Sequence, residues 1–441
     1  MTPGKLICIT LVILMLLILF GVHLYTSLMI TSLLGVFLVT GKFSTAMNVL
    51  YQAAWGQIRQ YMFGVIPLFV LMGLLANLSG ASQELYDSAS LLLKRVRGGV
   101  AIATILANAI FAAITGVTIA SASVFTKIAY PQMTRLAYDK KIAVGTVSGS
   151  AVLGMLIPPS LLMIVYGSQA DTSIGKLFIA GVGPGLLLTA VFIATILIFA
   201  KIHPDYIPPA AELTEEEKAD FWKTLLKPWA IVLLIIVSLG GIWFGFFTPT
   251  EAGGIGAFGA FLIVILKGRF SMKSMYETLL ATASTTGGVL ILLIAANTYS
   301  KCLSMAGVIN LIGNFLQGLE VAPVVIILIF IGILLLLGCI LDSTSILLLT
   351  IPLMVPTVRA LGYDTVWFGI VMIIATECGL ITPPFGMNVY TVKSALMGIK
   401  GAEDVTIEDI FSGSVPFLIA MVLVTLLCVF FPQIIMFLPN L

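Results

Sequence analysis

Long runs of apolar residues alternate with short polar segments along the whole sequence. Because a helix of roughly 20 apolar residues crosses a bilayer, this pattern predicts an all-α polytopic membrane protein. The apolar stretches of the first half are 6–22, 24–40, 61–79, 101–134, 143–167 and 177–200. Those of the second half are 229–247, 252–267, 281–300, 322–357, 366–397 and 414–438. Residues 44–60 and 301–320 alternate polar and apolar positions, a pattern compatible with helices that lie flat on the membrane.

The two halves of the chain repeat one another at a constant offset, which aligns Asp139 with Asp364 and Gly154 with Gly379. YPQMTRLAYDKK at 130–141 is followed by GMLIPP at 154–159, and VPTVRALGYDTV at 355–366 is followed by GLITPP at 379–384. Each half is therefore interrupted by Gly and Pro at matching places. Irregular backbone at membrane depth is tolerated where it lines a cavity, so the duplication is typical of a secondary transporter.

The duplication also predicts a topology. If 101–134 and 322–357 are re-entrant hairpins, each half crosses the membrane five times, and the two halves have opposite orientations. Most Lys and Arg residues then fall on the side of the polar linker 201–228, which the positive-inside rule assigns to the cytoplasm. Within the linker, Thr214 precedes Glu217 by three residues, and this spacing predicts a capping box that opens a short amphipathic helix.

Composition supports the same class of protein. The chain is 60% hydrophobic and 10% charged, and its mean hydropathy is +1.15, whereas soluble domains carry about 25% charged residues. A net charge of +2 argues against a nucleic-acid partner. The only histidines, His23 and His203, have no metal-ligand neighbours, and the sequence contains no nucleophilic triad or phosphate-binding loop. We therefore expect no enzymatic activity and no cofactor.

The two Pro-Pro motifs are the most specific local signal. A proline removes a backbone donor and clashes with the preceding turn, so the helices should break at Pro159 and Pro384. The carbonyl groups that end the first half-helix suit a hard cation such as Na⁺, and the amide groups that open the second suit an anion. The alternative is a kink without function, which is common in membrane helices.

Small hydroxyl residues occupy the middle of both expected hairpins, in TGVTIASAS at 115–123 and LDSTS at 341–345. Such residues can face a polar solute, or they can form a close helix–helix interface. Asp342 at this depth should face a cavity, a cation or a partner, or it caps a helix end. Glu377 either takes part in ion or proton coupling or pairs with a buried backbone group. Lys127 either extends to the cytoplasmic surface or binds substrate.

Four motifs together resemble the large membrane subunit of TRAP (tripartite ATP-independent periplasmic) transporters. They are GVIPLFVLMG (64–73), SGSAVLGMLIPPS (148–160), FTPTEAGG (247–254) and TECGLITPPFGMN (376–388), and the likeness runs over nearly the whole chain. The resemblance implies a multi-pass subunit of the bacterial inner membrane that imports a small organic acid, such as a C4-dicarboxylate or sialic acid. It also implies Na⁺ as the coupling ion. The implied partners are a small four-helix membrane subunit and a periplasmic substrate-binding protein.

The fold implied by this resemblance is an inverted-repeat elevator-type transporter with two re-entrant helical hairpins and two broken helices. Residues 1–200 would form the first repeat, with scaffold helices in 6–79 and transport elements in 101–200. Residues 229–441 would form the second, with scaffold helices in 229–300 and transport elements in 322–441.

The resemblance also implies site residues. A first sodium site would use backbone carbonyls of Ala112, Ala113, Gly154, Ile157 and Pro159. A second would use Gly338, Gly379, Thr382 and Phe385. Side chains expected to line the substrate cavity are those of Ser121, Ser123, Ser150, Asp342, Ser343, Thr344, Ser345 and Asn388. Alternative functions are a free-standing sodium–dicarboxylate symporter of the related elevator type and, from another class, an anion channel or a non-transporting membrane scaffold.

Overall fold

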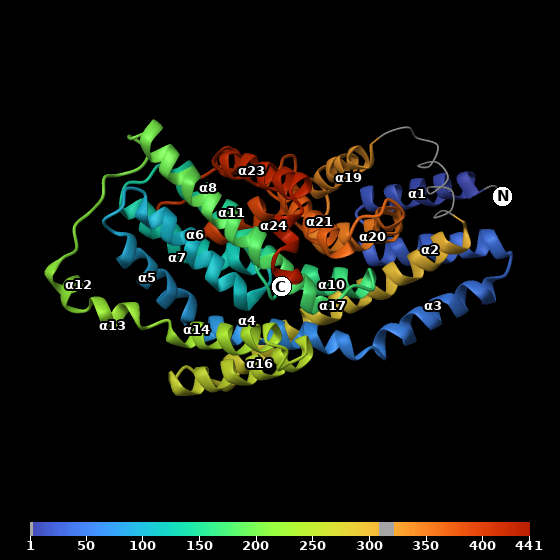
Figure 1. The fold of residues 1–441 in the computed structure, drawn as a ribbon, viewed down its shortest axis with the longest axis horizontal. Coiled ribbons are helices and arrows are strands. Elements are labelled where there is room, and N and C mark those ends of the chain that lie inside the picture. The colour runs from blue at the N-terminus through green and yellow to red at the C-terminus, as the bar shows by residue number, and fades with distance from the viewer. Residues whose placement is uncertain (1–2, 308–321) are drawn as a thin grey trace.

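The computed structural model describes residues 3–307 and 322–441, and every regular element within these ranges is a helix (Figure 1). Within these ranges, six helices are long and apolar enough to cross a membrane, or up to eight if each of two bent pairs counts as one span. The prediction of an all-α polytopic membrane protein is therefore confirmed. Most of the segment 301–320, for which we expected a flat helix, lies outside the described residues.

The first half contains eleven α-helices, and two short helices form the linker. They are α1 (Pro3–Leu19), α2 (Leu24–Thr40), α3 (Phe43–Ile58), α4 (Val65–Leu78), α5 (Ala81–Leu93), α6 (Gly99–Thr115), α7 (Thr118–Arg135), α8 (Lys140–Ala151), α9 (Leu153–Leu156), α10 (Leu161–Gln169), α11 (Ile174–Ile202), α12 (Glu215–Ala219) and α13 (Phe221–Leu225).

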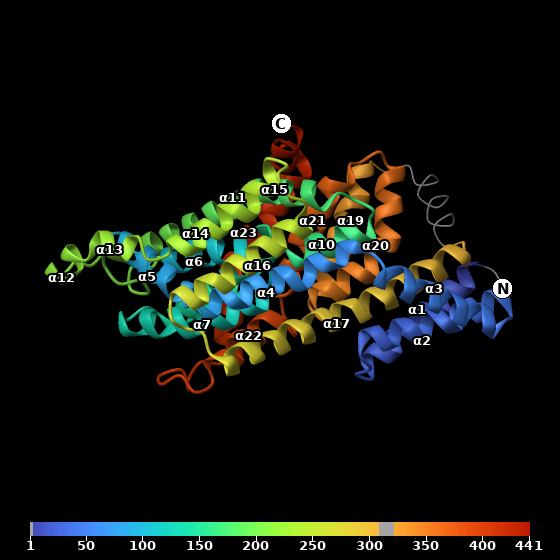
Figure 2. The same ribbon diagram turned by 90° about the horizontal axis from the view of Figure 1, so that it is seen from below.

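The second half begins after the linker. Its helices are α14 (Trp229–Ile235), a π-helical turn (Ile236–Gly240), α15 (Gly241–Trp243), α16 (Pro249–Leu266), α17 (Met272–Met305), α19 (Pro323–Gly338), α20 (Ser343–Ala360), α21 (Thr365–Gly379), α22 (Met387–Leu396), α23 (Ile407–Phe430) and α24 (Gln433–Met436). Helices α4, α16 and α17 run side by side along the long axis of the molecule (Figure 2).

Equivalent helices in the two halves begin at equivalent positions of the sequence repeat. Thr118 opens α7 and Ser343 opens α20, while α8 and α21 begin directly after Asp139 and Asp364. Both aspartates accept backbone N–H bonds, at 2.8 Å from Lys141 N and at 2.6 Å from Val366 N. An aspartate at this position satisfies backbone donors that have no partner within the helix. The repeated YD motif therefore corresponds to a repeated helix start.

The structure has helical hairpins at 99–135 and 323–360, and interrupted helices at the two Pro-Pro motifs. Helices α6 and α7 meet at Gly116, whose φ of 62° belongs to the left-handed region that favours glycine. Helices α19 and α20 meet at Asp342, which caps α20 by accepting the N–H of Ser345 at 3.1 Å. Helix α8–α9 ends before Pro158 and resumes as α10 at an angle of 40°, and α21 ends before Pro383.

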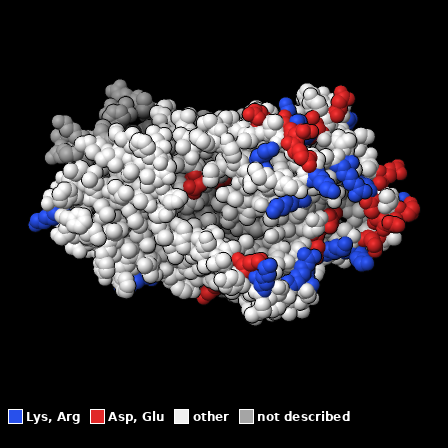
Figure 3. Space-filling model, turned by 180° about the vertical axis from the view of Figure 1, so that it is seen from behind, with Lys and Arg blue, Asp and Glu red and all other residues white. Residues whose placement is uncertain are grey.

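The linker also has the predicted cap. Thr214 and Glu217 form a reciprocal capping box at the start of α12, and Glu217 makes an ion pair with Lys94, just after α5. This ion pair holds the pKa of the Glu217 carboxyl below its usual value. On the face shown in Figure 3, charged side chains gather at the end of the molecule that carries the linker helices.

Helix α5 is an element that the apolar pattern did not predict. It turns by 63° from α4 and buries Leu85 and Tyr86 on one side only. Its polar residues shorten every apolar run in this part of the chain, so hydropathy alone does not reveal it. Helix α5 packs against α6, and the linker helix α13 contacts α5.

Glycine allows helices from the two halves to approach at backbone distance. A Cβ atom placed on Gly145 of α8 would overlap the carbonyl oxygen of Gly413 in α23. Membrane helices commonly use small residues in this way, because van der Waals contact drives their association. The two halves are therefore in direct contact through their main chains at this point. Main-chain atoms cannot move aside as the end of a flexible side chain can.

We predict that Gly145→Ala will lower the apparent Tm of the protein in detergent by several degrees, because overpacking of this kind costs about 1–3 kcal/mol. The matched control is Gly332→Ala in α19, where an added Cβ meets no atom within 4 Å. That variant should leave the Tm unchanged or raise it. Equal Tm values for the two variants would contradict the contact.

Candidate functional site

A buried carboxylate connects the two hairpins. Glu377, near the end of α21, is only 1% exposed. Its Oε2 accepts a hydrogen bond from Thr118 Oγ1 at 2.7 Å, and its Oε1 accepts one from Ser343 Oγ at 2.6 Å. Thr118 and Ser343 are the first residues of α7 and α20, directly after the two hairpin tips. Both tips are therefore bonded to the end of α21. The sequence analysis considered a buried backbone group as the partner of Glu377, but in the structure its partners are two hydroxyl groups.

This connection is asymmetric within the repeat. Thr118 and Ser343 occupy equivalent positions, but the position equivalent to Glu377 in the first half is the buried apolar residue Val152. A single carboxylate serves both tips. A buried polar group left without its hydrogen-bond partner costs about 1–3 kcal/mol, so this pair of bonds is a substantial local constraint.

Three of the five residues expected at the first sodium site, Ala112, Gly154 and Pro159, lie close to the first tip. An added Cβ on Gly116 would lie 2.5 Å from Pro159 O, and one on Gly154 would lie 3.1 Å from Val117 O. The N–H of Gly116 bonds to Ala112 O at 3.1 Å. The fold thus brings the first break against the first tip, although the role of these carbonyls in binding sodium stays a prediction. Five positions were predicted for this site: Ala112, Ala113, Gly154, Ile157 and Pro159.

Three of the four residues expected at the second sodium site also lie together. Gly338 and Gly379 are in backbone contact, because an added Cβ on Gly338 would lie 2.5 Å from Gly379 Cα. Thr382 donates its N–H to Gly379 O at 3.0 Å and its hydroxyl to Cys378 O at 2.7 Å. The side chain of Phe385 is 54% exposed. Sodium binding here likewise stays a prediction.

The residues expected to line a substrate cavity fall into separate groups. Asp342, Ser343, Thr344 and Ser345 lie at the second tip, where Ser343 and Ser345 are engaged by Glu377 and Asp342. In the fully buried interior, Asn108 donates to the hydroxyl of Ser150 at 2.6 Å, and Asn388 donates to the carbonyl of Ser148. Ser121 is also fully buried. Ser123 lines a cavity.

That cavity has a volume of about 260 Å³ and lies where α4, α7 and α17 meet, beside the first tip. Its wall is apolar on the side of Val70, Leu74 and Phe111. Polar groups reach it from Asn77 of α4 and Thr285 of α17. The sequence analysis did not single out these two residues, because each lies in a stretch that by itself is typical of helix packing.

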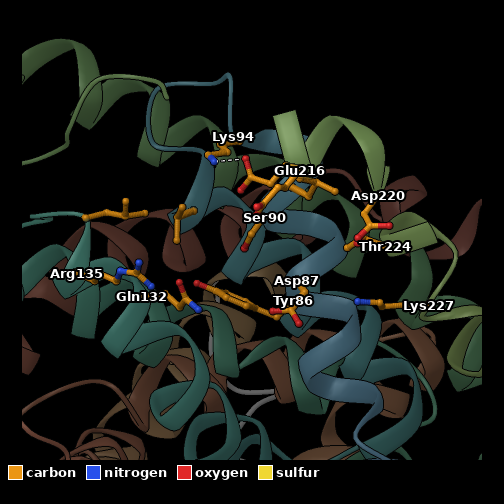
Figure 4. A pocket seen from close by; sticks show the side chains of 14 residues that line it. Tyr86, Asp87, Ser90, Lys94, Gln132, Arg135, Glu216, Asp220, Thr224 and Lys227 are labelled. Carbon is orange, nitrogen blue, oxygen red and sulfur yellow. Dashed lines mark hydrogen bonds and ion pairs between the residues drawn. The ribbon is translucent and has the colours of Figure 1, made fainter. Parts of the chain in front are cut away.

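A larger cleft of about 510 Å³ lies at the end of α7 near the linker (Figure 4). Gln132 and Arg135 of α7 line one side of this cleft, and Asp87 and Ser90 of α5 line another. The linker contributes further charged side chains of both signs, and the dashed line in Figure 4 marks the ion pair of Lys94. A wall of mixed charge gives this cleft no preference for an anion.

Hairpins, broken helices and an internal cavity are features of membrane transporters, and comparisons with known proteins identify the family. Residues 11–434 match the family model described as the tripartite ATP-independent periplasmic transporter, DctM component. The chain is 32% identical over 381 residues to the C4-dicarboxylate TRAP transporter large permease protein DctM of Pseudomonas aeruginosa, covering 86% of each chain. The chain therefore belongs to the DctM family of TRAP transporter large permeases, and it is a transporter component and not an enzyme.

Other relatives are similar over most of their length. The sialic acid TRAP transporter large permease protein SiaM of Vibrio cholerae is 28% identical, with 90% of this chain and 91% of the relative covered. The ectoine/5-hydroxyectoine TRAP transporter large permease protein UehC of Ruegeria pomeroyi is 29% identical, with 99% and 98% covered. The crystal structure of the YdaH transporter of Alcanivorax borkumensis has a similar fold, with a TM-score of 0.62 at 15% identity over 88% of this chain and 89% of that one.

We predict that Thr118→Val and Ser343→Ala will each destabilise the protein by about 1–3 kcal/mol, because each removes a buried donor to Glu377. In a Glu377→Ala background neither change should cost more than about 0.5 kcal/mol, since the shared acceptor is already gone. Thermal unfolding in detergent measures these effects. Thr126→Val is the control, because this buried threonine of α7 bonds only to Ala122 O of its own helix. Additive effects of the three changes would argue against a shared network.

Proposed function

We propose that this chain is the translocating subunit of a tripartite importer that carries a small organic anion into the cell together with Na⁺. The supporting observation is that both hairpin tips lie against broken helices, the first at Pro159 and the second at Gly379. Carbonyl groups at such breaks suit Na⁺, and the amide groups beyond them suit an anionic ligand. Relatives named for transport of C4-dicarboxylates and sialic acid are consistent with an organic acid as substrate.

The proposal includes the arrangement of the whole chain. The repeated helix starts support an inverted repeat in the inner membrane, in which hairpins and broken helices form a transport body and helices such as α4, α16 and α17 form a scaffold. Substrate and Na⁺ would then cross together by an elevator movement of the transport body. The partners would be a small four-helix membrane subunit and a periplasmic substrate-binding protein. Relatives named as single TRAP transporter permease proteins, from Haemophilus influenzae and Oleidesulfovibrio alaskensis, are matched over 59% and 60% of their length, which leaves room for a fused small subunit.

Uptake in proteoliposomes tests the function. The chain is reconstituted with its small subunit and binding protein, and uptake of labelled C4-dicarboxylates and sialic acid is followed with an inward Na⁺ gradient or with K⁺ in its place. We expect accumulation only with Na⁺ and the binding protein. Accumulation without Na⁺ would reject the coupling, accumulation without the binding protein would indicate a free-standing symporter, and uptake that never exceeds equilibrium would indicate a channel.

We further predict that Thr382→Val will raise the Na⁺ concentration for half-maximal uptake by roughly tenfold, the effect of losing about 1.4 kcal/mol of binding. Thr391→Val is the matched control, since this half-buried threonine of α22 bonds only to Met387 O. An equal Na⁺ dependence of the two variants would remove Thr382 from the proposed site.

A further inference from the structure

Among the residues that the structure describes, two charged side chains are buried, and only one of them has a counter-ion. Asp409 of α23 is 8% exposed, and its carboxylate lies 2.9 Å from the ammonium group of Lys140. Glu377 is 1% exposed and forms no ion pair within the described residues, where its partners are the uncharged hydroxyl groups of Thr118 and Ser343. A buried charge without an opposite charge is costly, so an ionised Glu377 needs a cation from outside the described chain.

The first proposed sodium site adjoins this carboxylate through Thr118. An added Cβ on Gly154 would lie 3.1 Å from the backbone nitrogen of Thr118, the residue whose hydroxyl bonds to Glu377 Oε2. Helix α21, which carries Glu377, also packs against α9, the short helix that contains Gly154. One residue thus connects the carboxylate with the carbonyl groups of the first break.

The second proposed sodium site adjoins the same carboxylate through the main chain. Gly379 follows Glu377 by two residues in α21, and Gly338 is in contact with Gly379 through backbone atoms. An added Cβ on Gly338 would also lie 3.1 Å from the carbonyl oxygen of Thr376, the residue before Glu377. The turn that carries the carboxylate therefore contacts the second hairpin through its main chain as well as through Ser343.

The two proposed sodium sites have the opposite electrostatic problem. Every residue expected at these sites is uncharged, so a bound Na⁺ would bring an uncompensated positive charge into a medium of low dielectric constant. Asp342, the other carboxylate near the second tip, is half-buried and already caps α20. The buried negative charge of Glu377 lies between the two neutral sites, and each charge reduces the cost of burying the other.

We propose that Glu377 is the counter-charge shared by the two sodium sites: it binds no ion directly, but its charge raises the affinity of both sites for Na⁺. This inference rests on the proposed function, because it deepens the Na⁺ coupling proposed there. Two substitutions separate this role from the bonding of the tips. Glu377→Gln keeps groups that can bond to Thr118 and Ser343 but removes the charge, whereas Glu377→Asp keeps the charge on a shorter side chain.

Thermal unfolding of the full-length chain in detergent tests the counter-charge without a substrate. The apparent Tm is measured at increasing NaCl, with choline chloride keeping the ionic strength constant and KCl in a parallel series. A cation that binds the folded state alone raises the Tm. Glu377→Gln should need a roughly tenfold higher Na⁺ concentration for the same rise, the effect of removing one nearby unit charge in a medium of intermediate dielectric constant. Glu377→Asp should lower the Tm but keep the wild-type response to Na⁺.

Asp409→Asn is the matched control, because this buried carboxylate already has Lys140 as its partner. It should lower the Tm by the same amount at every Na⁺ concentration. A wild-type response to Na⁺ in Glu377→Gln, or a response lost equally in Glu377→Asp, would overturn the counter-charge, and Na⁺-driven uptake by the wild-type complex would leave the proposed function intact. If Na⁺ stabilises the wild type no more than K⁺ does, the counter-charge and the proposed Na⁺ coupling both fail.

Discussion

The Glu377 carboxylate determines how the two hairpins are placed relative to each other. The donors on its two oxygens, Thr118 and Ser343, are distant in sequence and belong to different halves of the chain. Each donor is the first residue of a helix, so its position fixes where the preceding tip lies. Because the carboxylate is inaccessible to water, a lost donor cannot be replaced by solvent. The contacts of the first tip with Pro159 and of Gly338 with Gly379 occur in the arrangement that these two bonds hold together.

This arrangement gives the two tips different surroundings. The first tip lies beside the cavity lined by α4, α7 and α17, and the hydroxyl of Ser123 there makes no hydrogen bond with the residues that the structure describes. At the second tip, the hydroxyls of Ser343 and Ser345 are already bonded to Glu377 and Asp342. The two tips of a duplicated sequence thus differ in how many of their hydroxyl groups are bonded within the protein. Glu377 bonds to both tips, so the difference originates elsewhere: Asp342, which bonds Ser345 at the second tip, corresponds to Val117 at the first.

Much of the fold could be predicted from local signals. Apolar runs located the long helices, the Pro-Pro motifs located two breaks, and the spacing of Thr214 and Glu217 located a cap. Helix α5 was not predicted because its polar residues interrupt the apolar pattern. The hydrogen bonds of Glu377 and the positions of Asn77 and Thr285 at the cavity were not predicted, because they depend on helices that are distant in sequence. A carboxylate in an apolar stretch indicates that a partner exists but does not say which residue it is.

The glycine contacts have a consequence for how the protein responds to its surroundings. Where Gly145 meets Gly413 and Gly338 meets Gly379, the separation between helices equals the thickness of two main chains. Such a separation does not depend on side-chain rotamers, so it changes little with temperature or with the lateral pressure of the lipid. The interior of the protein should therefore keep its dimensions in membranes of different composition, while adjustment to lipid falls to the exposed aliphatic and aromatic side chains at the periphery.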